Sequence, residues 1–262
     1  WRRARQDSSY RGKRPVTTEA DRPVILWFRR DLRLEDNPAL THAVQTGRPI
    51  MPVYILDPAH GRAPGAASWW WLDKSLRALD AALRGRGSRL ILRRGDGEAE
   101  LRRLIDETGA DAVFMNRQFE PDASARDADI AHALKAEGVE CRGWNGALLC
   151  RPGGVMTGAG GPYKVFTPFF RALMETLETP PPLPAPDPIV TPSGIDGDRI
   201  NDWDLHPTRP DWSTRFDWTP GEDGAAAALS AFLRHGLADY ADGRDRPAQP
   251  ATSRLSPHLH FG

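Results

Sequence analysis

The sequence predicts an α/β fold: a Rossmann-like, five-stranded parallel sheet with helices on both faces, then a long linker and the first part of an all-helical region. Two observations support this prediction. Short apolar runs alternate with amphipathic helical segments over residues 24–141. Residues 178–221 hold ten of the 24 prolines and have no sustained periodicity. Alternating strands and helices are typical of a parallel sheet covered on both sides, and a proline-rich stretch of this length is typical of an interdomain linker.

The five strands are predicted from short runs of apolar residues, each suited to a buried position. They are residues 24–28, 50–56, 89–92, 112–115 and 139–141. Between them, Asp36 or Asn37 followed by Pro38 is typical of a helix N-cap and first helical position. A second helix is predicted from leucines at helical spacing, at Leu72, Leu76, Leu79 and Leu83. It is expected to end at Gly85 and Gly87.

Further helices are predicted from apolar stripes at residues 101–105 and 130–134. Thr167 and Pro168 are expected to begin another, whose apolar face would hold Phe166, Phe169, Phe170, Leu173 and Leu177. After the linker, a stripe formed by Ala225, Ala228, Leu229, Phe232 and Leu233 predicts a helix that ends near Gly236. We therefore expect a basic, disordered tail at 1–22, an α/β domain at 23–177, the linker at 178–221 and the start of a helical domain at 222–262.

The composition is that of a soluble globular protein, with 40% apolar and 27% charged residues and a net charge of zero. Cys141 and Cys150 are the only cysteines, which makes a disulfide framework improbable and fits a reducing compartment, so we expect a cytoplasmic location. No histidine stands at metal-ligand spacing to them, and we expect no metal site. No apolar run reaches the length of a membrane span.

Two short motifs are compatible with a bound anion. Residues 95–97 (GDG) follow a predicted strand as a dinucleotide fingerprint would, but Glu100 stands at the third glycine position and would repel a pyrophosphate, so a tight turn is favoured. Ser256 before Pro257 is typical of a helix start, and Thr252, Ser253 and Ser256 place three hydroxyls within five residues. Such a segment suits a diphosphate, although taken alone it is more often an ordinary helix cap. There is no P-loop and no nucleophile elbow.

Four separated segments resemble the photolyase/cryptochrome family. They are residues 27–37 (WFRRDLRLEDN), residues 116–120 (NRQFE) with 126–127 (RD), residues 154–158 (GVMTG) with 163–169 (YKVFTPF), and Tyr240, Arg244, Asp245 and residues 252–262. They occur in the family's order and extend over residues 23–262. The resemblance implies an N-terminal α/β domain that carries a light-harvesting antenna, followed by a helical domain that holds FAD.

The resemblance also assigns site residues. Tyr240, Thr252, Ser253, Arg254, Leu255 and Ser256 match positions that hold FAD, the last five mainly at its phosphates. Arg244 matches a position that contacts DNA. Taken alone, Arg244 is typical of a solvated loop charge and Tyr240 of a half-buried aromatic. The implied activity is that of a deoxyribodipyrimidine photo-lyase, a carbon–carbon lyase that splits cyclobutane pyrimidine dimers in UV-damaged DNA by light-driven electron transfer from reduced FAD. The resemblance assigns no catalytic acid, base or nucleophile to this chain.

One sequence difference from the family leaves the identity of the antenna chromophore open. Folate-binding members carry an Asn-Glu pair where this sequence has Asp122 and Ala123. Methenyltetrahydrofolate is therefore doubtful, and a deazaflavin, a second flavin or an empty site remain possible. Further family features, including its tryptophan electron-transfer chain, would lie beyond Gly262. Hence we expect a monomer in which the catalytic core is incomplete.

Several alternatives share these motifs. A cryptochrome receptor and a (6-4) photolyase have the same fold and flavin. From a different class, the α/β region could be a stand-alone nucleotide-binding module, although such modules do not carry a segment like residues 240–262.

Overall fold

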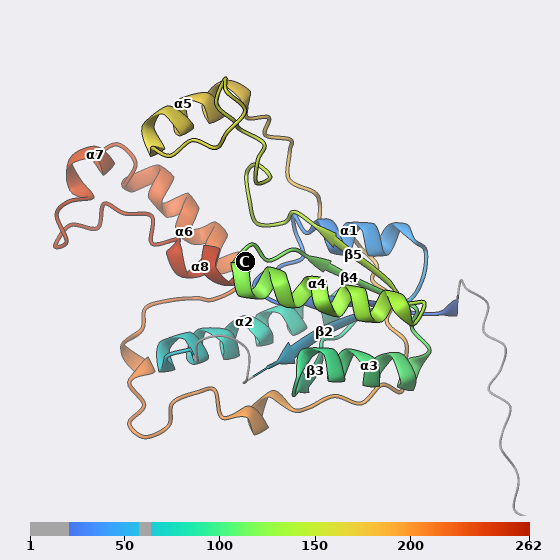
Figure 1. The fold of residues 1–262 in the computed structure, drawn as a ribbon. Coiled ribbons are helices and arrows are strands. Elements are labelled where there is room, and N and C mark those ends of the chain that lie inside the picture. Colours follow the sequence, from blue (N-terminus) through green and yellow to red (C-terminus); the bar gives the residue numbers. More distant parts are fainter. Residues whose placement is uncertain (1–20, 58–63) are drawn as a thin grey trace, which may run out of the picture.

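The structure, a computed structural model, describes residues 21–57 and 64–262. Most of the predicted basic tail, residues 1–20, lies outside the described part. Five strands and four helices alternate along the first half of the chain (Figure 1). In order they are β1 (Val24–Phe28), α1 (Pro38–Gln45), β2 (Ile50–Leu56), α2 (Ala66–Arg84), β3 (Ile91–Arg94), α3 (Gly97–Thr108), β4 (Ala112–Asn116), α4 (Pro121–Ala136) and β5 (Glu140–Trp144).

The five strands form one parallel sheet in the order β3-β2-β1-β4-β5. The chain builds outward from β1 through β2 to β3, and then returns to add β4 and β5 on the other side of β1. The direction of building therefore reverses between β1 and β4. In open parallel sheets, ligands bind beyond the carboxyl ends of the strands at such a reversal.

Helices cover both faces of the sheet, because alternate residues of each buried strand point to opposite sides. On one face, Val24, Leu26 and Phe28 of β1 belong to a core that includes α1 and the leucine stripe of α2. On the other face, Ile25 and Trp27 belong to a core with α3 and α4. The predicted α/β layers are confirmed, including the leucines at 72, 76, 79 and 83, all of which are buried.

Three strands differ from the sequence prediction at their ends: both ends of β3 and β5 are shifted, and β4 continues by one residue to Asn116. β3 begins at Ile91 rather than Arg89, because the Leu90 N–H donates to the Asp80 carboxylate (2.9 Å) and Arg89 reaches the Ile195 carbonyl group. β5 begins at Glu140 and continues to Trp144, where the prediction ended at Cys141. Arg142 and Gly143 lack the apolar character that marked the other strands, yet they pair with Phe114 and Met115 of β4.

The helix starts test the predicted caps. Asn37 caps α1 by accepting the Leu40 N–H (3.1 Å), and Asp96 caps α3 by accepting the Ala99 N–H (2.9 Å). The GDG segment is thus the tight strand-to-helix turn. Two predicted caps are wrong. Helix α5 (Phe166–Thr176) is capped by Val165 rather than Thr167, and α8 (Ser256–Phe261) is capped by Leu255, whose backbone is already helical.

The proline-rich stretch packs against the α/β layers instead of spanning free space. Its regular structure is limited to two 3-10 turns, η2 (Ile200–Trp203) and η3 (Ser213–Arg215). Ile189, Ile195 and Trp203 are buried in the two cores. Along the edge of the sheet, the Asp198 N–H donates to the Leu92 carbonyl group of β3 (2.8 Å).

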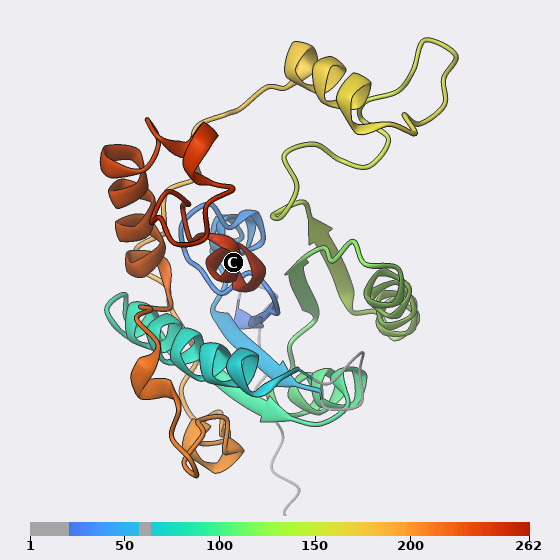
Figure 2. The ribbon, with the colours of Figure 1, turned by 90° about the vertical axis from the view of Figure 1, so that its left-hand side faces the viewer.

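The remaining helices are α6 (Glu222–His235), the short α7 (Tyr240–Gly243) and α8. They lie together beside the sheet, whereas α5 stands away from it (Figures 1 and 2). The predicted apolar faces of α5 and α6 are largely exposed, including Phe166, Phe170, Leu229 and Leu233. Among the helices that the structure describes, none is both long and apolar enough to cross a membrane.

Candidate functional site

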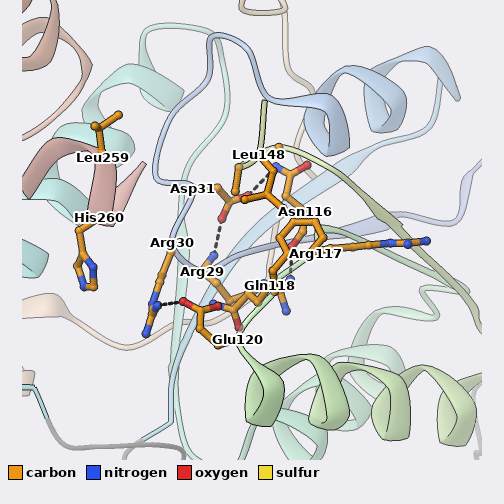
Figure 3. A pocket seen from close by; sticks show the side chains of 13 residues that line it. Arg29, Arg30, Asp31, Asn116, Arg117, Gln118, Glu120, Leu148, Leu259 and His260 are labelled. Atoms are coloured by element: carbon orange, nitrogen blue, oxygen red, sulfur yellow. Dashed lines mark hydrogen bonds and ion pairs between the residues drawn. The ribbon is translucent and has the colours of Figure 1, made fainter. Parts of the chain in front are cut away.

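A cavity of about 420 Å³ opens at the carboxyl ends of β1, β4 and β5, where the order of the strands reverses. We call it the sheet-end cavity. Its walls come from the loops after these three strands and from α8 (Figure 3). The lining residues are Arg29, Arg30, Asp31, Asn116, Arg117, Gln118, Phe119, Glu120, Gly146, Ala147, Leu148, Leu259 and His260.

Asn116, the last residue of β4, joins the walls of this cavity by a buried hydrogen-bond network. Its amide group donates to the Asp31 carboxylate (2.7 Å) and to the Asn37 side-chain oxygen (2.8 Å). Its own side-chain oxygen accepts the Ala39 N–H (3.2 Å). Asp31 also accepts the Arg29 N–H (2.7 Å). One amide therefore fixes the loop after β1, the start of α1 and the end of β4.

Glycine at position 146 is required by this network. A Cβ atom there would lie 2.7 Å from the Asn116 Cγ atom, closer than real contacts allow. The loop after β5 can therefore approach the Asn116 amide only without a side chain.

Two arginines that follow β1 make different ion pairs at this cavity. Arg29 is buried, bonds both oxygens of the Asp127 carboxylate (3.0 Å each), and lies over the Trp27 ring at 4.5 Å. Arg30 is half-exposed and pairs with Glu120, which comes just before α4 (Figure 3). Arg29 is therefore a fixed part of the wall, while the exposed Arg30–Glu120 pair lies on the cavity lining, where water screens it.

A second cavity, of about 540 Å³, lies between α6 and the segment that leads into α8. We call it the α6–α8 cavity. One wall is formed by α6 and the following Gly236, with small residues at Gly224, Ala227, Ala228 and Ala231. The opposite wall holds Thr252, Ser253, Arg254 and His258, and Trp218 and Asp217 complete the lining together with Thr219 and Pro250.

Arg254 is held in an unusual conformation at this cavity. Its φ angle is +54°, a region that a residue with a side chain rarely adopts. Its guanidinium lies over the Trp218 ring at 4.1 Å and donates to the Asp217 carbonyl group (3.2 Å). Such backbone outliers gather at ligand sites, where the surrounding contacts maintain them.

An aromatic cluster closes the inner side of the α6–α8 cavity. Trp71 of α2 contacts Trp218 edge-on at 5.5 Å, and the His258 ring at 5.0 Å. Burial lowers the pKa of His258, so the neutral imidazole is favoured against these rings. Trp70 and Trp71 are both buried.

The structure brings together some of the predicted site residues and separates others. Thr252, Ser253 and Arg254 line the α6–α8 cavity, whereas Leu255 and Ser256 do not. Tyr240 is also outside the lining; it is partly exposed and contacts the Phe232 ring edge-on at 5.6 Å. Arg244 is exposed, lies 5.9 Å from the Tyr240 ring and pairs with the adjacent Asp245 (3.7 Å).

Sequence reasoning missed three residues of these cavities. Asn116 was part of a recognised motif without a stated role, and Trp218 and His258 were given none. Only the proximity of distant segments could reveal them, because Asn116 bonds Asp31 and Asn37 across 85 and 79 positions. Within residues 21–57 and 64–262, no group of three or more His, Cys, Asp or Glu side chains is placed to hold a metal ion.

Comparison with known proteins identifies the family. The profile of the DNA photolyase family matches residues 24–187, well over half of the chain. The chain belongs to the DNA photolyase family.

Individual relatives include both photolyases and cryptochromes. A deoxyribodipyrimidine photo-lyase from Agrobacterium fabrum is 46% identical over 92% of this chain and 50% of its own length. Cryptochrome-1 from Arabidopsis thaliana is 36% identical over 91% of this chain and 36% of its own length. The crystal structure of a bacterial class III photolyase from Agrobacterium tumefaciens matches with a TM-score of 0.88 and 44% identity, over 94% of this chain and 52% of that one. This photolyase-family chain thus spans about half the length of the photolyases it matches.

Proposed function

We propose that this chain forms the α/β part and the first flavin-binding helices of a deoxyribodipyrimidine photo-lyase that splits cyclobutane pyrimidine dimers in DNA. The observation that carries the proposal is the α6–α8 cavity. Three of the residues that match FAD-binding positions, Thr252, Ser253 and Arg254, line it side by side. The similarity to photolyases over more than nine-tenths of the chain supports the same activity.

The chemistry of the α6–α8 cavity suits the diphosphate of FAD. Two hydroxyls and one guanidinium lie on one wall, and hydroxyls and cations are the usual partners of phosphate oxygens. The glycine and alanines of α6 on the facing wall leave room for a large group to approach the helix backbone. Ser256 and Leu255, next to this wall, and Tyr240, near α6, would complete the contacts in the longer protein.

The residues of this chain would bind and position FAD and DNA, and none of them would transfer a proton. The chemistry that FAD supplies when bound is the light-driven electron transfer to the dimer. Arg254 lies over the Trp218 ring and near the Asp217 carboxylate (3.8 Å), and its guanidinium would bind a phosphate. Arg244 is exposed and would contact the DNA backbone. The lesion must leave the base stack to reach the flavin, and its poor stacking lowers the cost of that step.

The sheet-end cavity is the place we propose for an antenna chromophore. It lies at the reversal of strand order and offers buried polar groups beside apolar side chains such as Leu148 and Leu259. Asp122 is exposed and Ala123 is buried in the first turn of α4, and neither lines this cavity. We therefore propose a deazaflavin or a second flavin in preference to a folate. Identification of the chromophores released from the denatured longer protein tests this choice, and stoichiometric folate would refute it.

The decisive experiment uses the full-length protein that contains this chain. It is incubated with an oligonucleotide holding one thymine dimer, under blue light and in the dark. We expect repair in the light alone. No repair by flavin-loaded, photoreducible protein would contradict the proposal, and the same protein is then assayed on a (6-4) lesion.

A second candidate function is that of a cryptochrome, a blue-light receptor. The similarity to cryptochrome-1 over 91% of the chain favours it. Light-dependent flavin chemistry without repair of either lesion would support this alternative.

A further inference from the structure

Helix α8 is a wall shared by both cavities. His258 faces the α6–α8 cavity, while the next two residues, Leu259 and His260, line the sheet-end cavity (Figure 3). The two cavities have no lining residue in common. Because α8 has only six residues, a displacement that moves His258 also moves Leu259 and His260.

Both walls of the α6–α8 cavity are bonded to one segment of the α/β layers. We call residues 29–37 the post-β1 segment. On the α8 side, the Leu32 N–H donates to the Phe261 carbonyl group (2.9 Å). On the α6 side, the Glu222 carboxylate accepts the N–H groups of Leu34 (3.0 Å) and Glu35 (2.9 Å). Hydrogen bonds to a carboxylate are about twice as strong as those between neutral groups.

The post-β1 segment in turn forms part of the sheet-end cavity. Arg29, Arg30 and Asp31 line that cavity, and Asp31 is bonded to Asn116 on its far side. The two helices at one cavity are therefore joined to the polar network at the other by hydrogen bonds at each end and by the backbone of the post-β1 segment between them.

Helix α6, at the start of this connection, is held by few apolar contacts, whereas α8 packs on Trp71 through His258 and Phe261. Leu229 and Leu233 of α6 are exposed. Elements with few buried apolar contacts open locally at low free-energy cost. A ligand that bridges α6 and α8 would suppress this opening. Binding of a second ligand would then cost less conformational entropy, because its site is already ordered.

We infer that the two cavities are energetically coupled through the post-β1 segment. A ligand in the α6–α8 cavity holds α6 and α8 in place, and thereby orders the wall of the sheet-end cavity and raises the affinity there. Linkage requires the reverse effect to be equal. The inference rests on the proposed function, since FAD is the ligand expected in the α6–α8 cavity.

Amide hydrogen exchange with mass spectrometry tests the coupling directly. The full-length protein that contains this chain is stripped of flavin and then titrated with FAD until exchange of residues 252–258 no longer changes. Exchange is then read in residues 29–37, which do not line the α6–α8 cavity. We expect exchange of residues 29–37 to slow by about fivefold or more, the lower end of usual coupling strengths.

Variants at Glu222 separate the coupling from FAD binding itself. Glu222→Ala removes both acceptors, so FAD should still slow exchange of residues 252–258, with a smaller effect on residues 29–37. Glu222→Gln keeps one acceptor oxygen and should restore part of the effect. Glu175→Ala is the matched control, because Glu175 is an exposed glutamate on α5 that lines neither cavity.

The outcomes distinguish the two ideas. Slower exchange of residues 252–258 without any change in residues 29–37 would refute the coupling and leave the FAD site standing. The full effect on residues 29–37 in the Glu222→Ala variant would also refute it. No change in either segment at saturating FAD would refute the proposed FAD site, and the inference with it.

Discussion

At the scale of single residues, Asn116 joins distant parts of the chain through its side-chain amide. Its amide makes three buried hydrogen bonds, two to the post-β1 segment and one to α1. We predict that Asn116→Ala lowers the free energy of unfolding by about 3 kcal/mol, because the Asp31 carboxylate and the Ala39 N–H then lose a partner without access to water. Urea denaturation followed by circular dichroism measures the change.

Asn145→Ala is the matched control for this variant. Asn145 is an exposed asparagine whose side chain bonds only within its own turn, to Ala147 and Leu148. Its loss should cost no more than about 1 kcal/mol. Equal effects of the two substitutions would mean that the hydrogen bonds of Asn116 stabilise the fold no more than those of an exposed turn.

A second prediction concerns the response of His258 to pH. Its pKa is lowered by burial, so below the ordinary histidine pKa of about 6.5 the unfolded chain binds a proton that the folded chain resists. The stability present at pH 7.5 is therefore lost as the pH falls below about 6.5. We expect His258→Phe, which keeps a ring against Trp71, to lose less stability between pH 7.5 and 5.5 than the original chain.

Some pH dependence should remain in that variant, because the pKa of His260 is also lowered, mainly by burial and further by Arg30. His132→Phe is the matched control for the substitution, at an exposed position on α4. An unchanged pH dependence in His258→Phe would show that His258 is freely protonated in the folded chain.

Residue-level features were predictable where they depend on neighbours in the sequence. The Asn37 cap follows from Asn before Pro, and the turn at residues 95–97 from its glycines and Glu100. Thr252, Ser253 and Arg254 were found by resemblance to a family motif. Partners that come from distant segments, such as Trp71 for His258, required the folded chain, since no local pattern specifies them.

At the scale of elements, all five strands were predicted, and the errors lie at their ends. The start of β3 and the end of β5 depend on side-chain bonds and pairing partners rather than on apolar character. The caps of α5 and α8 were wrong because Ser and Thr near a proline were expected to form side-chain caps, and these helices begin without one.

The proline-rich linker illustrates an element whose composition conceals its contacts. Trp203 is 6% exposed, its indole N–H donates to Asp198 (3.1 Å), and its ring lies 6.2 Å from that of Tyr54 on β2. We predict that Trp203→Ala lowers the free energy of unfolding by about 3 kcal/mol, as for other buried aromatic residues. Urea denaturation provides the measurement.

Val190→Ala, an exposed position in the same linker, should change the free energy of unfolding by no more than about 0.5 kcal/mol. If Trp203→Ala is equally mild, the linker is not docked on the α/β layers in solution.

At the scale of the whole molecule, the order of strands places both the sheet-end cavity and the post-β1 segment at the carboxyl edge of the sheet. The parallel class was predictable from alternation along the chain. The order β3-β2-β1-β4-β5 was not predicted, because the apolar pattern of a strand does not specify which strands lie beside it.

The fraction of the relatives that this chain spans leads to a further prediction. With about half the length of the photolyases it matches, the chain supplies only part of the surface that would surround FAD. We expect the 262-residue chain to purify without stoichiometric flavin and to repair no DNA. Visible absorbance after gel filtration measures the retained flavin, and a value near one FAD per chain would contradict this expectation.

The hydrogen bond from Asp198 to Leu92 also has a consequence for solubility. An unpaired strand at the edge of a sheet can recruit a strand from another molecule and start aggregation. Here the linker lies along β3, where Gly197 approaches so closely that a Cβ atom would lie 3.3 Å from the Leu92 backbone nitrogen and oxygen. The segment that connects the two parts of the chain thus also shields one sheet edge from intermolecular pairing.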